Sequence, residues 1–231
     1  MKVEPRVDRE ALVQKLAALY RISVSALAFV PEGETSVAYA VSTGEGRRFL
    51  VKLWPSSRQG LAMRARLGVT LPLTRELYER GLVPNLPCPV TSAAGELLHP
   101  FGEYALCLFP FLQGRPLPED RAGWPPGMLE ALAKTYANLH RAAPLLKSPL
   151  PDRPAFDMSF AGDFTRGLAR LEDGALKERP GLVGLRDLLL GLQSQLLGWL
   201  EETFDLCAEA QRSAGPLVLC HTDMGGNNLL V

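Results

Sequence analysis

The sequence predicts an α+β protein, with an antiparallel sheet in its first part and mainly helices in its second. Short apolar stretches separated by turns dominate residues 1–112, a pattern typical of antiparallel strands and hairpins. From Pro125 onwards, apolar residues recur at helical spacing. Two short apolar stretches near the end flank a polar loop. We therefore expect an N-terminal part at 1–112 and a partial, helical C-terminal part at 113–231.

Composition and charge exclude several classes of function. The chain of 231 residues is 47% hydrophobic and 22% charged, and its formal net charge is +0, so no strong field favours nucleic acid. It has no apolar run of about eighteen residues, so we expect no membrane span. The N-terminus lacks the apolar core of a signal peptide, and the four cysteines show no C-x-x-C spacing. A cytoplasmic location is the resulting expectation.

Charge is nevertheless distributed unevenly along the chain. Residues 1–100 carry a net charge of +4 and residues 150–215 a net charge of −4. A basic half and an acidic half suit an anionic cosubstrate and a cationic acceptor, although solvated surface charge explains the same counts. Carboxylates that could meet a cationic acceptor are Asp152, Asp157, Asp163, Glu172 and Asp173.

The first part should open with a helix, followed by three strands. Asp8 is a suitable N-cap, and leucines recur at helical spacing until the helix ends near Tyr20. Apolar stretches between turns then predict strands at 29–30, 37–41 and 48–54. The turn before the second strand could cover phosphates with backbone amides of Gly33, Thr35 and Ser36, but an ordinary hairpin would use the same residues.

Two features of the later strands could bind a nucleotide. Lys52 lies mid-strand on one face with Leu50 and Trp54, so it is either a surface residue on an open face or a functional cation. An apolar strand at 104–112 follows. In it, the Phe109 C=O and the Phe111 N–H point to the same side, as an adenine base would require. A buried strand ending in a turn is equally compatible with that pattern.

The second part should be helical until its final loop. Apolar residues predict helices over 129–140, 163–171 and 182–207, with a long loop at 144–162. An apolar strand at 217–220 then leads into His221-Thr-Asp223, and Asn228 precedes a last strand at 229–231.

The pattern H-x-D-x-x-x-x-N between two strands suits phosphoryl transfer. That reaction uses a carboxylate to accept the proton of the attacking hydroxyl and an amide oxygen to hold Mg²⁺. Gly225 and Gly226 should let the loop turn tightly, because glycine tolerates positive φ. Local capping of the turn by Asp223, or half of a metal site formed with His221, are the alternatives.

Taken in this order, the features resemble the aminoglycoside phosphotransferase and choline kinase-like family, relatives of the protein kinases, and most nearly its spectinomycin phosphotransferase type. The resemblance implies a bilobal protein-kinase-like fold and ATP-dependent phosphorylation of a hydroxyl on an aminoglycoside or aminocyclitol. Asp223 would be the catalytic base, His221 would brace the loop, and Asn228 would bind Mg²⁺. The residues implied to bind ATP are Lys52, Gly33, Thr35, Ser36, Phe109 and Phe111.

The sequence also departs from this family. The helix expected at 58–80 should carry a glutamate that pairs with Lys52, yet residues 56–75 contain no Asp or Glu. Either Glu76 pairs from an unusual register or the partner is missing, and Pro72 interrupts the stretch. The family also has a second metal-binding Asp and further helices after the last strand. We therefore expect residues 1–231 to show little activity, and the unpaired edge at 229–231 to favour a homodimer.

Three other functions remain open from the sequence. A pseudokinase would bind nucleotide without turnover. A metabolite kinase would act on choline or homoserine. A metal-dependent hydrolase would use His221 and Asp223 together with His99 or His140.

Overall fold

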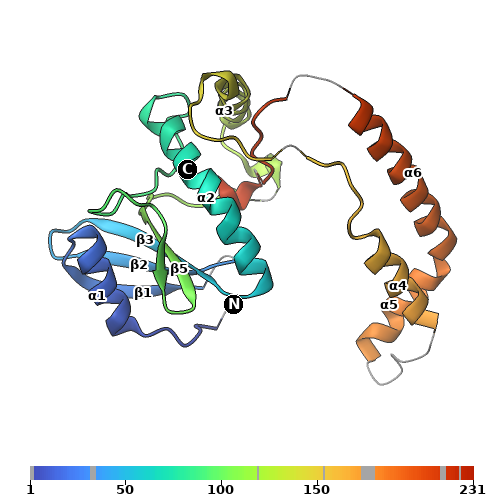
Figure 1. The fold of residues 1–231 in the computed structure, drawn as a ribbon, viewed down its shortest axis with the longest axis horizontal. Coiled ribbons are helices and arrows are strands. Elements are labelled where there is room, and N and C mark those ends of the chain that lie inside the picture. The colour runs from blue at the N-terminus through green and yellow to red at the C-terminus, as the bar shows by residue number, and fades with distance from the viewer. Residues whose placement is uncertain are drawn as a thin grey trace. The chain divides into compact units, whose positions relative to one another are not determined.

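One antiparallel sheet organises the first half of the chain in the computed structural model (Figure 1). Its strands are β1 (Val24–Val30), β2 (Val37–Thr43), β3 (Arg48–Pro55), β4 (His99–Phe101) and β5 (Tyr104–Pro110). Their order in the sheet is β1-β2-β3-β5-β4. This sheet, together with the helices described below, confirms the predicted α+β class.

The structure describes residues 3–31, 35–118, 120–152, 154–172, 180–213, 217–223 and 225–231. They divide into two units, Met1–Pro151 with Val218–Val231 and Asp152–Leu217. The described residues predicted to bind nucleotide or Mg²⁺ or to act in catalysis belong to the first unit. The predicted boundary at residue 112 lies inside this unit and stays a prediction.

Helix α1 (Arg9–Tyr20) covers one face of the sheet. Asp8 caps it as predicted, because its carboxylate accepts the Ala11 N–H at 2.9 Å. Leu12 and Leu16 are fully buried against alternate residues of the strands. Burial of these side chains in one cluster stabilises the packing of α1 on this face.

Helix α2 (Arg58–Glu79) covers the opposite face. Its Leu67 and Leu71 pack with Trp54 of β3 and Cys107 of β5. The helix continues through Pro72, contrary to the expected interruption. Proline removes one N–H and crowds the preceding turn, and the leucines buried on either side of Pro72 offset that loss.

A third apolar cluster joins α2 to the helical part of the first unit. Leu73 and Leu77 at the end of α2 pack with Leu139 and Ala142 of α3 (Met128–Ala142), and Leu219 packs against the cluster. Short 3₁₀ turns lie before α3 (η1, Arg121–Gly123), after it (η2, Ala143–Leu145) and in the final loop (η3, Gly226–Asn228).

The second unit contains α4 (Ala161–Glu172), α5 (Pro180–Gly191) and α6 (Gln193–Arg212). The single helix predicted over 182–207 is wrong, because the chain breaks at Leu192, where φ is −106° and ψ is 3°. The preceding Gly191 is a weak helix former, which makes this a favourable place for a break. Among the helices that the structure describes, none is long and apolar enough to cross a membrane.

Candidate functional site

Lys52 projects from the middle of β3 on the face that α2 covers. It pairs with Ala38 of β2 and Cys107 of β5, and its Nζ lies 5.9 Å from the centre of the Phe109 ring. Burial lowers the pKa of Lys52, because a low-dielectric surrounding disfavours the charged form. No carboxylate of the described residues lies within ion-pair distance of this ammonium group. Lys52 is thus a half-buried amine, and its positive form would be stabilised by a bound anion.

Two of the three residues predicted for the turn before β2, Thr35 and Ser36, belong to the described residues. Val37 pairs with Leu53, so Thr35 and Ser36, just before it, lie beside the end of β3 that follows Lys52. Ser36 is almost fully buried and Thr35 is half-buried. Gly33, the third residue predicted for this turn, lies outside the described residues.

The predicted adenine contacts at the end of β5 need correction. Phe109 pairs with Leu50, and the Phe111 N–H already donates to the Arg48 C=O at 3.1 Å. The backbone groups of Phe109 and Phe111 therefore point towards β3, and the Phe111 donor is engaged. The Arg48 guanidinium also stacks on the Phe111 ring at 3.9 Å. Sequence alternation alone showed that the two groups share a side, but not which neighbour occupies that side.

The same alternation directs the backbone N–H and C=O groups of the residues next to Phe109 towards the other edge of β5. Leu108 C=O lies on that edge, where it accepts the Val90 N–H at 2.8 Å. Continued alternation past the end of β5 predicts that Pro110 C=O and Leu112 N–H share this edge, one residue along from the pair predicted first. They would form an acceptor and a donor two residues apart, which is the arrangement that an adenine base needs.

Hydrogen bonds within the final loop connect the three residues predicted to act in it, His221, Asp223 and Asn228. The Asp223 N–H donates to His221 Nδ1 at 3.3 Å, and Asn228 Nδ2 donates to the Asp223 C=O at 3.1 Å. Because the amide nitrogen of Asn228 is used in this way, its Oδ1 remains for another ligand. The Asp223 carboxylate is exposed, and within the described part of the chain no hydrogen bond to it is found.

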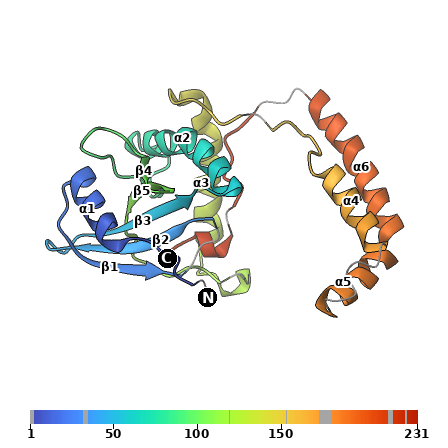
Figure 2. The same ribbon diagram turned by 60° about the horizontal axis from the view of Figure 1, so that its bottom comes forward.

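This loop is seated on the segment that follows β5, as both ribbon views show (Figures 1 and 2). The Leu117 N–H donates to Gly226 C=O and Leu229 C=O, each at 3.1 Å. A Cβ on Gly226 would lie 2.8 Å from the Leu117 oxygen and 2.6 Å from the Pro118 oxygen. Close approach of the backbone, not positive φ, is therefore the reason for glycine here, since Gly226 has no positive φ and Gly225 has φ of −71°.

The two strands predicted around the loop are wrong in part. Residues 217–220 have no strand structure, and Leu217 and Val218 are about half exposed. The last stretch does not lack a partner: Leu230 bridges Pro116, and Val231 exchanges two backbone hydrogen bonds with Arg115 at 2.9 and 3.1 Å. Residues 115–117 thus satisfy one side of this edge. A homodimer formed through its other side stays a prediction.

Glu76 is not the partner of Lys52. Its carboxylate accepts backbone N–H groups of Lys147 and Ser148 and pairs with Arg80. These bonds hold the pKa of Glu76 at about 2, well below its ordinary value. Of the two possibilities that the sequence left open, the structure favours a Lys52 without a helix carboxylate.

The histidines do not converge on one point. His99 is buried in β4 against the Tyr20 ring, and His140 of α3 lies 5.9 Å from the Tyr136 ring. His140 Nε2 also lies 3.9 Å from the Cys220 sulfur. Across the described ranges, no group of three or more His, Cys, Asp or Glu side chains is placed to hold a metal. No observation therefore favours a metal-dependent hydrolase.

The acidic residues proposed for a cationic acceptor lie in the second unit. Asp163 is exposed and paired with Arg166. Asp152 and Asp157 are exposed, and Asp173 lies outside the described residues. The acceptor role of these carboxylates stays a prediction.

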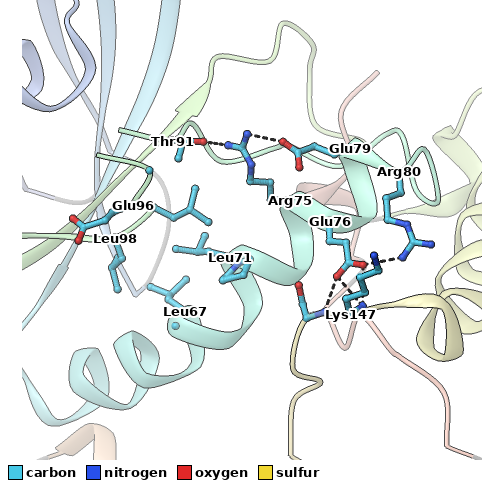
Figure 3. Close-up of a pocket in the computed structure, with 15 residues that line it drawn as sticks. Leu67, Leu71, Arg75, Glu76, Glu79, Arg80, Thr91, Glu96, Leu98 and Lys147 are labelled. Carbon is cyan, nitrogen blue, oxygen red and sulfur yellow. Dashed lines mark hydrogen bonds and ion pairs between the residues drawn. The ribbon is translucent and has the colours of Figure 1, made fainter. Parts of the chain in front are cut away.

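A cavity of about 800 Å³ lies beside α2 and was not anticipated from the sequence (Figure 3). Leu67, Leu71 and Leu98 contribute apolar surface, and Arg75 and Glu79 form an ion pair at its edge. None of the predicted nucleotide or catalytic residues lines it. It is therefore separate from the site built around Lys52 and the final loop.

The sheet order and the polar residues of the final loop are those expected of the family that the sequence resembles. Residues 26–231 match the Phosphotransferase enzyme family, and the chain belongs to that family. This confirms the resemblance inferred from the sequence. None of the curated proteins matches the chain in sequence.

Solved structures show the same fold at low sequence identity. Spectinomycin phosphotransferase in complex with ADP and spectinomycin superposes with a TM-score of 0.69 at 14% identity, over 99% of this chain and 66% of that one. An aminoglycoside phosphotransferase from Alicyclobacillus acidocaldarius gives a TM-score of 0.53 at 18% identity, over 99% and 63%. This chain thus spans less than two thirds of the length of either neighbour.

Proposed function

We propose that residues 1–231 carry the nucleotide-binding part and the catalytic loop of an ATP-dependent phosphotransferase that acts on a small-molecule hydroxyl. The observation that carries this proposal is the half-buried Lys52, which has a depressed pKa and no described carboxylate within reach. A buried cation whose charge no described carboxylate balances is costly, and bound phosphates would supply negative charge beside it.

The side chains and backbone groups of this site are of the kinds that bind a nucleotide and Mg²⁺. Lys52 would hold phosphate oxygens, with Thr35 and Ser36 in the adjoining turn. Pro110 C=O and Leu112 N–H would receive the adenine edge. Asn228 Oδ1 is the type of ligand that Mg²⁺ prefers. When bound, Mg²⁺ would neutralise charge on the transferring phosphoryl group.

The remaining steps belong to the protein's own loop. Asp223 would orient the acceptor hydroxyl and accept its proton at a carboxylate oxygen. His221, which accepts the Asp223 N–H, would keep that residue facing the acceptor. Asn228 would hold the other end of the turn through its bond to the Asp223 C=O.

For the acceptor, we propose an aminoglycoside or aminocyclitol type of molecule. The structural neighbour that contains spectinomycin supports this class, and so does the acidic character of residues 150–215. Kinases of choline or homoserine type have the same reaction and stay as the alternative. Residues 1–231 by themselves should bind nucleotide but turn over little, because Asn228 is their one proposed Mg²⁺ ligand. Nucleotide binding without turnover is also what a pseudokinase would show.

Calorimetric titration of the 231-residue protein with ADP and Mg²⁺ tests the nucleotide site. We expect Lys52→Met to weaken binding at least about tenfold, since a hydrogen bond to a charged group contributes roughly 1.5–3 kcal/mol. Lys134→Met is the matched control, because Lys134 is exposed on α3 and paired with Glu130. No binding of ADP by the wild type, or equal losses in both variants, would contradict the proposal.

A further inference from the structure

Glu76 makes contacts that a surface glutamate on a helix does not make. One of its carboxylate oxygens accepts the Lys147 N–H at 2.9 Å, and the other accepts the Ser148 N–H at 2.7 Å (Figure 3). Arg80 donates to the same carboxylate at 2.8 Å. The side chain is only 14% exposed. Glu76 thus ties the last turns of α2 to a segment about seventy residues further along the chain.

The position of this carboxylate on the helix makes the contacts more informative. Negative charge is disfavoured near the C-terminal end of a helix, where the backbone carbonyls carry partial negative charge. Glu79, one turn later, is 51% exposed, and among the described residues its ion-pair partner is Arg75. Glu76 instead receives two backbone donors and a guanidinium, which more than offset the unfavourable end of the helix. The local helix therefore does not explain Glu76, but the distant segment does.

Helix α2 connects the two halves of the proposed site. Its middle packs through Leu67 and Leu71 beneath the strand that carries Lys52. Its end packs through Leu73 and Leu77 on α3. The same cluster includes Leu219, two residues before His221 of the final loop. A displacement of the end of α2 would therefore change the position of the final loop relative to β3.

We propose that Glu76 is a positioning residue: it fixes the end of α2 on the segment after α3, and so sets the distance between Lys52 and the Asp223–Asn228 loop. This inference rests on the proposed function for its consequence, since the distance matters only if both halves hold one nucleotide. Its structural part, the capture of the Lys147 and Ser148 amides, stands without it. The described contacts of Glu76 are with Arg80, Lys147 and Ser148 and include neither Lys52 nor the described part of the loop, so Glu76 would act through α2.

Amide hydrogen exchange of Glu76→Gln tests the structural part. A neutral glutamine offers one acceptor oxygen in place of two, and its NH₂ group would face backbone donors. We expect the Lys147 and Ser148 amides to exchange about tenfold faster or more, while Glu79→Gln leaves them unchanged. Unchanged exchange in Glu76→Gln would overturn the inference. If this variant does not fold, Glu76→Asp, which keeps the charge but shortens the side chain, is measured in the same way.

Calorimetric titration with ADP and Mg²⁺ tests the positioning part, at a temperature at which every variant is fully folded. We expect Glu76→Gln to weaken binding at least about fivefold, a modest coupling between two sites, and Glu79→Gln to bind as the wild type does. A role in stability alone would lower the melting temperature but leave the affinity of the folded protein unchanged, and would overturn the positioning role. If the wild type binds no nucleotide, the proposed function fails, while amide exchange still decides the capture of the two amides.

Discussion

Leu77→Ala measures how much the packing of α2 on α3 contributes to the stability of the protein. Leu77 is 3% exposed and packs in one cluster with Leu139 and Ala142 of α3. The substitution removes three carbons, which costs about 2.4 kcal/mol at roughly 0.8 kcal/mol for each buried methylene. The residual cavity adds to this loss, so we expect a destabilisation of about 3–4 kcal/mol.

Thermal unfolding, followed by circular dichroism, measures this effect. In a protein of this size, 1 kcal/mol lowers the melting temperature by roughly 2–4 °C, so a fall of roughly 6–16 °C is expected. Leu61→Ala is the matched control because Leu61 belongs to the same helix but is 52% exposed. Its cost should stay within about 0.5 kcal/mol.

Both substitutions replace leucine by alanine in the same helix. A difference between their changes in melting temperature therefore reports the difference in burial of the two side chains. A fall in melting temperature for Leu77→Ala no larger than that for Leu61→Ala would show that the cluster of α2 and α3 does not form as described. It would also remove the packing on which the positioning role of Glu76 depends.

Two further predictions follow from the loop and from Glu76. Gly226→Ala would place a Cβ 2.6 Å from the Pro118 oxygen, so the free energy of unfolding measured in urea should fall by about 1–3 kcal/mol. Gly44→Ala is the control, because a Cβ there meets nothing within 4 Å, and it should leave this free energy nearly unchanged. Equal losses in the two variants would refute the close approach at Gly226. The pKa of Glu76 is about 2, below its ordinary value of 4.5, so its stabilising effect is present above about pH 4.5 and lost as pH falls towards 2. The difference in urea midpoint between wild type and Glu76→Gln should therefore narrow between about pH 6 and pH 3, and a constant difference would contradict the assignment.

The elements predicted well are those with local causes. Asp8 caps α1 because a carboxylate at that position meets free amides of the first turn, whatever the rest of the fold does. The face of β3 that carries Lys52 follows from strand alternation alone. The short spacing of His221, Asp223 and Asn228 likewise predicted that these residues share one loop, where hydrogen bonds connect them.

The features that were missed depend on partners far along the chain. Alternation placed Phe109 and Phe111 on one side of β5, but only the pairing with β3 shows that this side is occupied. Residues 217–220 are apolar enough for a strand, yet Leu219 is used in a helix cluster instead. Glu76 had no local reason to reach Lys147, and no pattern in the sequence connects the two.

The absence of carboxylates between residues 56 and 75 has a physical reason in this fold. The side of α2 that faces the sheet is filled by Leu67 and Leu71, and Arg64 donates to the Trp54 C=O at 3.0 Å. A glutamate placed there would bring a charge into an apolar cluster whose neighbouring donor is already engaged, at a considerable cost in desolvation. Within the described chain, Lys52 is therefore left without a helix carboxylate, and burial depresses its pKa. An incoming phosphate would relieve that cost, so nucleotide binding should itself stabilise the sheet and α2, more than it would if an internal ion pair already neutralised the lysine.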